Sequence, residues 1–115
     1  MMLVDTSVWV EHFRHGLPAL ADQLLAGEVA THEVVPGELA TGNLAQRTMT
    51  LGWLARLPCI PACSAAECMA ILEKHHLYGL GLGWCDVQLL SAASHAGVAL
   101  WTLDKRLAAA AKRLG

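Results

Sequence analysis

Two short apolar segments that each end in an aspartate constrain the fold of this chain more than any other feature. Residues 1–4 read MMLV and lead into Asp5, and residues 98–103 read VALWTL and lead into Asp104. Each segment has the length and composition of a buried strand, and each aspartate is followed by residues at helical spacing. A strand followed by a helix, repeated along a chain, is typical of a parallel sheet covered by helices.

The rest of the chain alternates between helical and extended patterns in the same way. Short apolar segments at 28–32 and 59–63 are further strand candidates, and Pro61 restricts the second one to a sheet edge. Ser64, followed three residues later by Glu67, is a capping-box pattern that predicts a helix start. Apolar residues at helical spacing predict helices over 7–16, 17–27, 36–43, 44–57, 64–77, 84–97 and 104–114.

The length and composition favour one folded domain. The chain has 115 residues, of which 55% are hydrophobic and 16% charged, and this balance is typical of a globular protein with a single core. We predict one domain over residues 1–115, an α/β three-layer sandwich whose central, mostly parallel sheet has four or five short strands. No apolar run reaches the roughly 18 residues of a membrane span, and the start of the chain lacks the pattern of a secretory signal. We therefore expect a cytoplasmic protein that does not associate with membranes.

The cysteines and histidines give only weak indications of a metal site. Cysteines stand at positions 59, 63, 68 and 85, without the CxxC spacing of common zinc sites. Free cysteines often serve as small core residues, so this pattern favours buried thiols over a zinc site. The six histidines are scattered and are interpreted as ordinary surface or packing residues.

Four of the ten acidic residues stand in apolar surroundings. Asp5 and Asp104 end the two apolar segments, and function in open parallel sheets gathers at the carboxyl ends of the strands. Glu38 lies in VVPGELA and Asp86 in GWCDVQLL, each at the start of a predicted helix. A carboxylate at a helix start can also serve only to cap the helix or to interact with its dipole. Position along the chain leaves both interpretations open.

Four carboxylates in one pocket would repel one another and could not all stay ionised without a cation. An all-oxygen site of this kind suits Mg²⁺ or Mn²⁺, which can activate water for attack on a phosphate. The chain offers no Ser-His-Asp order and no phosphate-binding glycine loop with a following lysine. Metal-assisted phosphodiester hydrolysis is the chemistry that these residues support.

Charge is consistent with a partner that carries phosphate groups but does not require one. The chain has eight Lys and Arg residues against ten Asp and Glu residues, for a net charge of −2, which argues against non-specific binding to nucleic acid. If four acids surround a metal ion, six acidic residues remain to face the eight basic ones. The exterior would then be neutral to basic.

Four segments, LVDTSVWVEHFR, VVPGELA, WCDVQLLSAA and LWTLDKRL, occur in this order and are spread over nearly the whole chain. In sequence and separation they resemble the four signature segments of PIN-domain ribonucleases, and most of all the VapC-like toxins of bacterial toxin–antitoxin pairs. Each segment alone is weak, whereas all four together are specific.

The resemblance implies an acidic quartet at the catalytic centre, made of Asp5, Glu38, Asp86 and Asp104. Of these, Asp5, Asp86 and Asp104 would ligate Mg²⁺ or Mn²⁺, and Ser7 and Thr102 would support the quartet by hydrogen bonds. Arg106 stands where many members carry a further acid, so the resemblance gives no support to a full second metal site.

The resemblance also implies partners and a fold. It implies a doubly wound α/β sandwich, an RNA substrate such as tRNA or another structured RNA, a homodimer, and neutralisation by a cognate antitoxin protein. The alternative is a catalytically silent PIN-like module that binds RNA or protein. Response-regulator and haloacid-dehalogenase sites fit less well, because VDTS supplies a single aspartate and Ser7 stands where the second type requires another.

Overall fold

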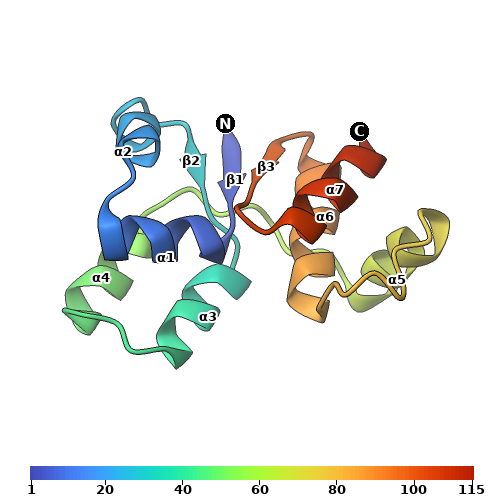
Figure 1. Cartoon of the computed structure of the whole chain (residues 1–115), viewed down its shortest axis with the longest axis horizontal. Helices are drawn as coiled ribbons and strands as arrows, with labels where there is room; N and C mark the ends of the chain where they lie inside the picture. The colour runs from blue at the N-terminus through green and yellow to red at the C-terminus, as the bar shows by residue number, and fades with distance from the viewer.

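Three short parallel strands form the centre of the protein in a computed structural model that describes residues 1–115. The central strand β1 (Met2–Val4) lies between β2 (Val29–Ala30) and β3 (Ala99–Trp101), and both pairings are parallel. Figure 1 shows the three strands side by side in the middle of the molecule. This order brings the carboxyl ends of β1 and β3 next to each other, as an α/β topology requires.

The helices form two groups that lie on opposite sides of the strands, as Figure 1 shows. The first four helices gather on the side of β2, and the last three on the side of β3. Among them, α3 packs against α1 and α6, and α6 packs against α5 and α7. The helices are α1 (Thr6–His15), α2 (Pro18–Leu25), α3 (Val34–Thr41), α4 (Arg47–Leu54), α5 (Ala65–Lys74), α6 (Trp84–Ala96) and α7 (Lys105–Leu114).

The α/β class is confirmed, but the sheet has three strands and not the four or five that we predicted. Segment 59–63 contributes only one bridge, in which Thr31 N–H donates to the Pro58 carbonyl and Ile60 N–H donates to the Thr31 carbonyl, both at 2.8 Å. Pro58 has no N–H to donate to β2, and after His32 the chain turns into the start of the next helix at Glu33, so the ladder does not extend. The fourth strand is therefore reduced to a single bridged residue beyond β2.

The helix boundaries agree closely with the pattern of the sequence. The capping box at α5 is present, because Glu67 N–H donates to Ser64 Oγ at 3.1 Å and Ser64 N–H donates to Glu67 Oε1 at 2.8 Å. Helix α3 begins at Val34, two residues before the predicted start at Pro36. Proline is tolerated there because the N–H groups of the first turn have no partner within the helix.

Most of the apolar segments pack into one core between the sheet and its helices. Leu3 and Val4 of β1 and Trp9 of α1 are fully buried in it. A smaller cluster joins the later helices, with Leu90 of α6 against Leu107 of α7. Strand β3 is less buried than its sequence suggests, with an exposed first residue, because it forms an edge of the sheet. None of the helices combines the length and the apolar character needed to cross a membrane.

The prediction that the cysteines are buried is wrong for three of the four. Cys68 of α5 is buried, whereas Cys59 is exposed and both Cys63 and Cys85 are partly exposed. Cys59 and Cys63 lie in the connection before α5, and Cys85 lies in the first turn of α6, so none of these three faces the interior of a helix pair. Their thiols remain available for other interactions.

One histidine is enclosed in the core region without a full set of hydrogen bonds. His32 is completely buried, its Nδ1 accepts the Val34 N–H at 3.1 Å, and its Nε2 has no partner. Because Nδ1 accepts a hydrogen bond, the neutral ring must carry its proton on Nε2. Burial lowers the pKa of His32, although the neighbouring charge of Glu33 opposes the shift.

We expect His32 to make the protein less stable in mild acid. Below about pH 6.5 the unfolded chain takes up a proton that the buried ring resists, so the free energy of unfolding falls as the pH falls. Replacing His32→Asn, which keeps an acceptor for the Val34 N–H, should lower stability at pH 7.5 but flatten its decline between pH 7.5 and 5. Urea unfolding across this range measures the effect, with the exposed His15→Gln as control. An unchanged decline in His32→Asn would contradict the prediction.

Candidate active site

The carboxylate of Asp5 organises the polar residues at the ends of β1 and β3. It is only 6% exposed, and its Oδ2 accepts hydrogen bonds from the Ser7 hydroxyl at 2.6 Å and from the Thr102 hydroxyl at 2.7 Å. The Ser7 N–H contributes a longer bond of 3.4 Å to the same oxygen. Hydrogen bonds of this kind offset the cost of burying a charge.

The two hydroxyls also accept hydrogen bonds, which extends the network into the start of α7. Leu103 N–H donates to Ser7 Oγ and Asp104 N–H donates to Thr102 Oγ1, each at 3.0 Å. Since both hydroxyl hydrogens already point at Asp5, the 3.2 Å separation of the two hydroxyl oxygens is a contact and not a further bond. The network therefore locks the turn after β1 to the turn after β3.

Asp104 caps α7 with one of its two oxygens. Its Oδ1 accepts from the Arg106 N–H at 2.9 Å and from the Leu107 N–H at 3.1 Å, as expected of an N-cap residue. Its Oδ2 makes no hydrogen bond within the chain.

Asp86 lies in the first turn of α6, three residues after the N-cap Gly83. Its Oδ2 accepts the Gly83 N–H at 2.8 Å, and its other oxygen has no partner. Burial raises the pKa of Asp86; the Gly83 hydrogen bond opposes the rise, and the negative charges of Asp5 and Asp104 add to it. These charges act on Asp86 because the three carboxylates lie on the same part of the surface.

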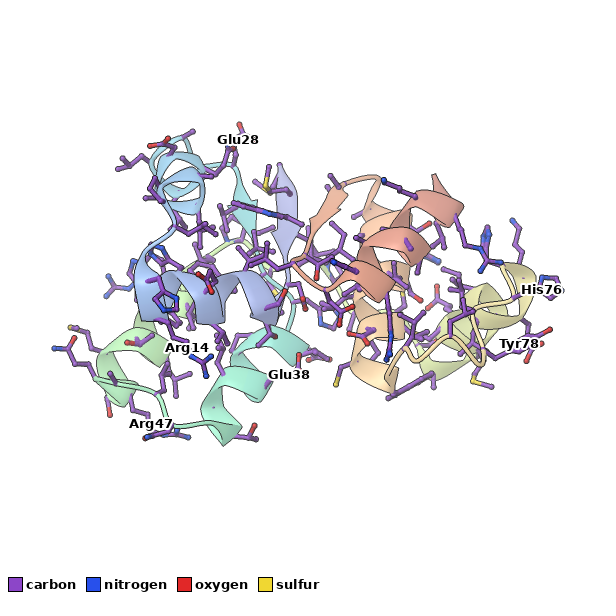
Figure 2. All side chains as sticks on the ribbon, viewed as in Figure 1. Arg14, Glu28, Glu38, Arg47, His76 and Tyr78 are labelled. Atoms are coloured by element: carbon purple, nitrogen blue, oxygen red, sulfur yellow. The ribbon has the colours of Figure 1, made fainter.

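Glu38 reaches this region from α3. Its Oε1 accepts the Thr6 hydroxyl hydrogen at 2.8 Å, and Figure 2 shows its side chain extending from α3 toward α6. Burial, followed by the charges of Glu38 and Asp86, raises the pKa of the Cys85 thiol beside them. A protonated thiol is a poor nucleophile, so the acids and not this cysteine carry the chemistry available here.

The four acids share one arrangement. Each accepts hydrogen bonds from the chain through one carboxylate oxygen and leaves the other oxygen without a partner in the chain. No Lys, Arg or His forms an ion pair with any of them. The guanidinium of Arg106 lies instead against Gly81, close enough that a Cβ at that glycine would meet Nη1 at 2.6 Å. The capping interpretation and the shared-site interpretation are thus both compatible with this geometry.

The four carboxylates do not pack tightly against one another. No three of them place oxygens within 4.8 Å of each other, and the one potential metal-ligand trio that does so lies elsewhere, at Cys63, Glu67 and His95. The unpaired oxygens are hard ligands of the kind that Mg²⁺ and Mn²⁺ prefer, so the donor set fits such an ion.

The sequence did not indicate two residues of this site. Thr6 holds Glu38 across a separation of 32 residues, and no local pattern signals such a contact. Gly83 holds Asp86 through its backbone, and here a signal existed, because a glycine at the N-cap with an acid three residues later resembles a capping box.

Comparison with known proteins gives a consistent result. The sequence model of the PIN-domain family matches residues 2–113. Two curated proteins from two strains of Mycobacterium tuberculosis, both called Ribonuclease VapC32, are 42% identical to this chain over 116 residues. The alignment covers 100% of this chain and 94% of each of those proteins.

The electrostatic link between the acids can be measured directly. Replacing Asp5→Asn removes one negative charge but keeps a carbonyl oxygen for the hydroxyl donors, so the pKa of Asp86 should fall toward its ordinary value. NMR titration of the Asp86 side-chain carbon in the presence of a chelator reports this shift. The distant Glu11→Gln serves as control and should leave Asp86 unchanged. If the pKa of Asp86 is the same in Asp5→Asn as in the wild type, the two carboxylates are not neighbours.

Proposed function

This chain belongs to the PIN-domain family, and on that basis we propose that it is an endoribonuclease that hydrolyses RNA phosphodiester bonds with the help of Mg²⁺ or Mn²⁺. The observation that carries the proposal is the set of four carboxylates that come from four separate segments and each keep one oxygen free. These oxygens form an acidic donor set with which no Lys, Arg or His is paired, and such a set suits a divalent cation.

The proposal gives each acid a role. Asp5, Asp86 and Asp104 would hold the cation, since each has an oxygen that makes no hydrogen bond within the chain, and Glu38 would complete the quartet from α3. The bound ion supplies an activated water and neutralises the charge that develops on the phosphate. Thr6 then fixes the orientation of Glu38 through the hydrogen bond at 2.8 Å.

Ser7 and Thr102 act as positioning residues in this proposal. Both donate to Oδ2 of Asp5, so the other oxygen of that carboxylate is held in a fixed direction. Groups that orient metal ligands in this way commonly matter nearly as much as the ligands themselves.

The proposal extends to partners. We expect a structured RNA such as tRNA as substrate, a cytoplasmic location, a homodimer, and a cognate antitoxin that neutralises the enzyme. Apolar side chains are available for protein contacts, because Phe13 of α1 and both Met49 and Trp53 of α4 are exposed. Met49 and Trp53 are four residues apart and so lie on one face of α4.

Removing a charge from the quartet should abolish cleavage without unfolding the protein. We expect Asp5→Asn and Asp86→Asn to lower the rate of RNA cleavage by about two orders of magnitude or more, since each loses a charged ligand. Chelation by EDTA should have the same effect on the wild type, and added Mg²⁺ or Mn²⁺ should restore activity. Cleavage of total cellular RNA, mapped by sequencing of the new ends, gives the readout.

Glu11→Gln is the matched control, because it removes a partly exposed acid on α1 whose carboxylate pairs with His15 and with no member of the quartet. It should cleave RNA at the rate of the wild type. Equal cleavage by wild type and Asp5→Asn would reject the proposal. Binding of Mn²⁺ by calorimetry without any cleavage would favour the silent RNA- or protein-binding module.

The positioning role of Thr102 can be separated from a structural one. Thr102→Val has almost the same shape but loses both the bond to Asp5 and the acceptor for Asp104 N–H, so cleavage should fall by about tenfold to a hundredfold. Thr102→Ser keeps the hydroxyl and should restore most of the activity. The two variants are compared by cleavage rate at several Mg²⁺ concentrations, where Thr102→Val should require more ion. Equal rates for both variants would exclude this role.

A further inference from the structure

A second cluster of potential metal ligands lies outside the acidic quartet. The Cys63 thiol, the Glu67 carboxylate and the His95 imidazole place one ligand atom each within 4.8 Å of the others. Their donor set of sulfur, oxygen and nitrogen differs from the all-oxygen quartet. None of these three residues has a role in the proposed cleavage reaction.

The three side chains come from two helices that pack together. Cys63 lies just before the N-cap of α5, Glu67 lies in its first turn, and His95 lies in the last turn of α6. Cys63 is partly exposed, and the other two are exposed. The cluster is therefore open to ions from solvent and bridges the start of α5 to the end of α6.

The capping box fixes the Glu67 carboxylate before any ion arrives. Its Oε1 accepts the Ser64 N–H at 2.8 Å, and its Oε2 points toward His95. Ser64 Oγ in turn accepts the Glu67 N–H at 3.1 Å. A ligand that is oriented by a hydrogen bond through its second oxygen needs little rearrangement to bind a metal.

The spacing of the ligands suits a small tetrahedral ion. His95 Nε2 and Glu67 Oε2 are 3.5 Å apart. Two ligands on one tetrahedral zinc ion, at usual Zn–N, Zn–O and Zn–S distances, are separated by about 3.4 to 3.6 Å. The nitrogen and the oxygen already meet this separation, and the sulfur, which lies within 4.8 Å of both, needs to come closer by at most about 1.4 Å.

We propose that Cys63, Glu67 and His95 form a Zn²⁺-binding site that joins the start of α5 to the end of α6. Thiolate, imidazole and carboxylate are the three ligand types of protein zinc sites, and three of them leave a fourth position for water. Hard ions such as Mg²⁺ bind thiolates poorly, so this site is selective against the ion of the quartet. The proposal does not depend on nuclease activity.

An ordinary His–Glu pair is the competing explanation for this contact. The chain contains one for comparison, at His15 and Glu11, where Nδ1 and Oε1 lie 3.0 Å apart with no cysteine beside them. The distinguishing feature of the proposed site is the thiol. Burial and the nearby Glu67 charge raise the pKa of Cys63, and a divalent cation between the two groups would relieve that repulsion.

Cobalt titration tests the site through its thiolate ligand. The full chain is stripped with EDTA, reduced, and titrated with Co²⁺ in excess Mg²⁺, which occupies the quartet. A single equivalent of Co²⁺ should produce the near-ultraviolet charge-transfer band of a cobalt–thiolate bond, and Zn²⁺ should bleach that band by displacement. Zn²⁺ should also raise the melting temperature, because it binds only the folded chain.

The variants decide between the proposal and the competing explanation. Cys63→Ser should lose the band, and His95→Gln should weaken Zn²⁺ binding by more than about tenfold. His15→Gln and Cys59→Ser are the matched controls and should bind like the wild type. Circular dichroism without metal checks that every variant is folded, and if Cys63→Ser is not, the loss of affinity in His95→Gln decides alone. Absence of the band in the wild type, its survival in Cys63→Ser, or its loss in Cys59→Ser would overturn the site.

Discussion

The hydrogen bonds that the two hydroxyls donate to Asp5 are the interaction on which the rest of the structure depends. They hold a nearly buried carboxylate at the end of the central strand without any cationic partner. Because one hydroxyl belongs to α1 and the other follows β3, residues almost a hundred positions apart are fixed against each other. The position of Asp104 follows from the same network, since its N–H donates to Thr102. The same hydrogen-bond network thus fixes the edge of the sheet and the positions of both acids.

Much of this arrangement could be predicted from the sequence, for a physical reason. Parallel strands end at a common edge, so aspartates after two apolar segments were expected to lie near one another there. In the structure Thr102 connects the two turns, because it donates to Asp5 and accepts the Asp104 N–H. The strand count could not be predicted, because whether Cys59 extends the sheet depends on how the segment after Pro58 meets β2. The contact of Thr6 with Glu38 could also not be predicted from the sequence, since it depends on how α3 packs against α1. The burial of the cysteines could not be predicted from residue type, because two of the exposed or partly exposed thiols lie in a connection between helices and the third lies in a first helical turn.

Helix α6 has a different kind of ligand at each end. Asp86 lies in its first turn, where the helix dipole favours a negative charge, and His95 lies in its last turn, where it favours a positive one. Nine residues separate them, or about 13 Å along the helix axis. The oxygen-rich quartet and the proposed sulfur-containing site are therefore separate in space as well as in ion preference. An ion at either end would bind to the same helix, α6, which contacts both α3 and α5.

The two oxygens of each carboxylate have different roles, and this has a consequence for the effect of removing the metal. The oxygens that build the helix starts and the sheet edge are not the ones left available for a cation. The hydrogen bonds that fix the helix starts and the sheet edge therefore do not use the oxygens that the proposed site assigns to the ion. In the proposed nuclease, removal of the ion would stop cleavage without breaking any of these hydrogen bonds.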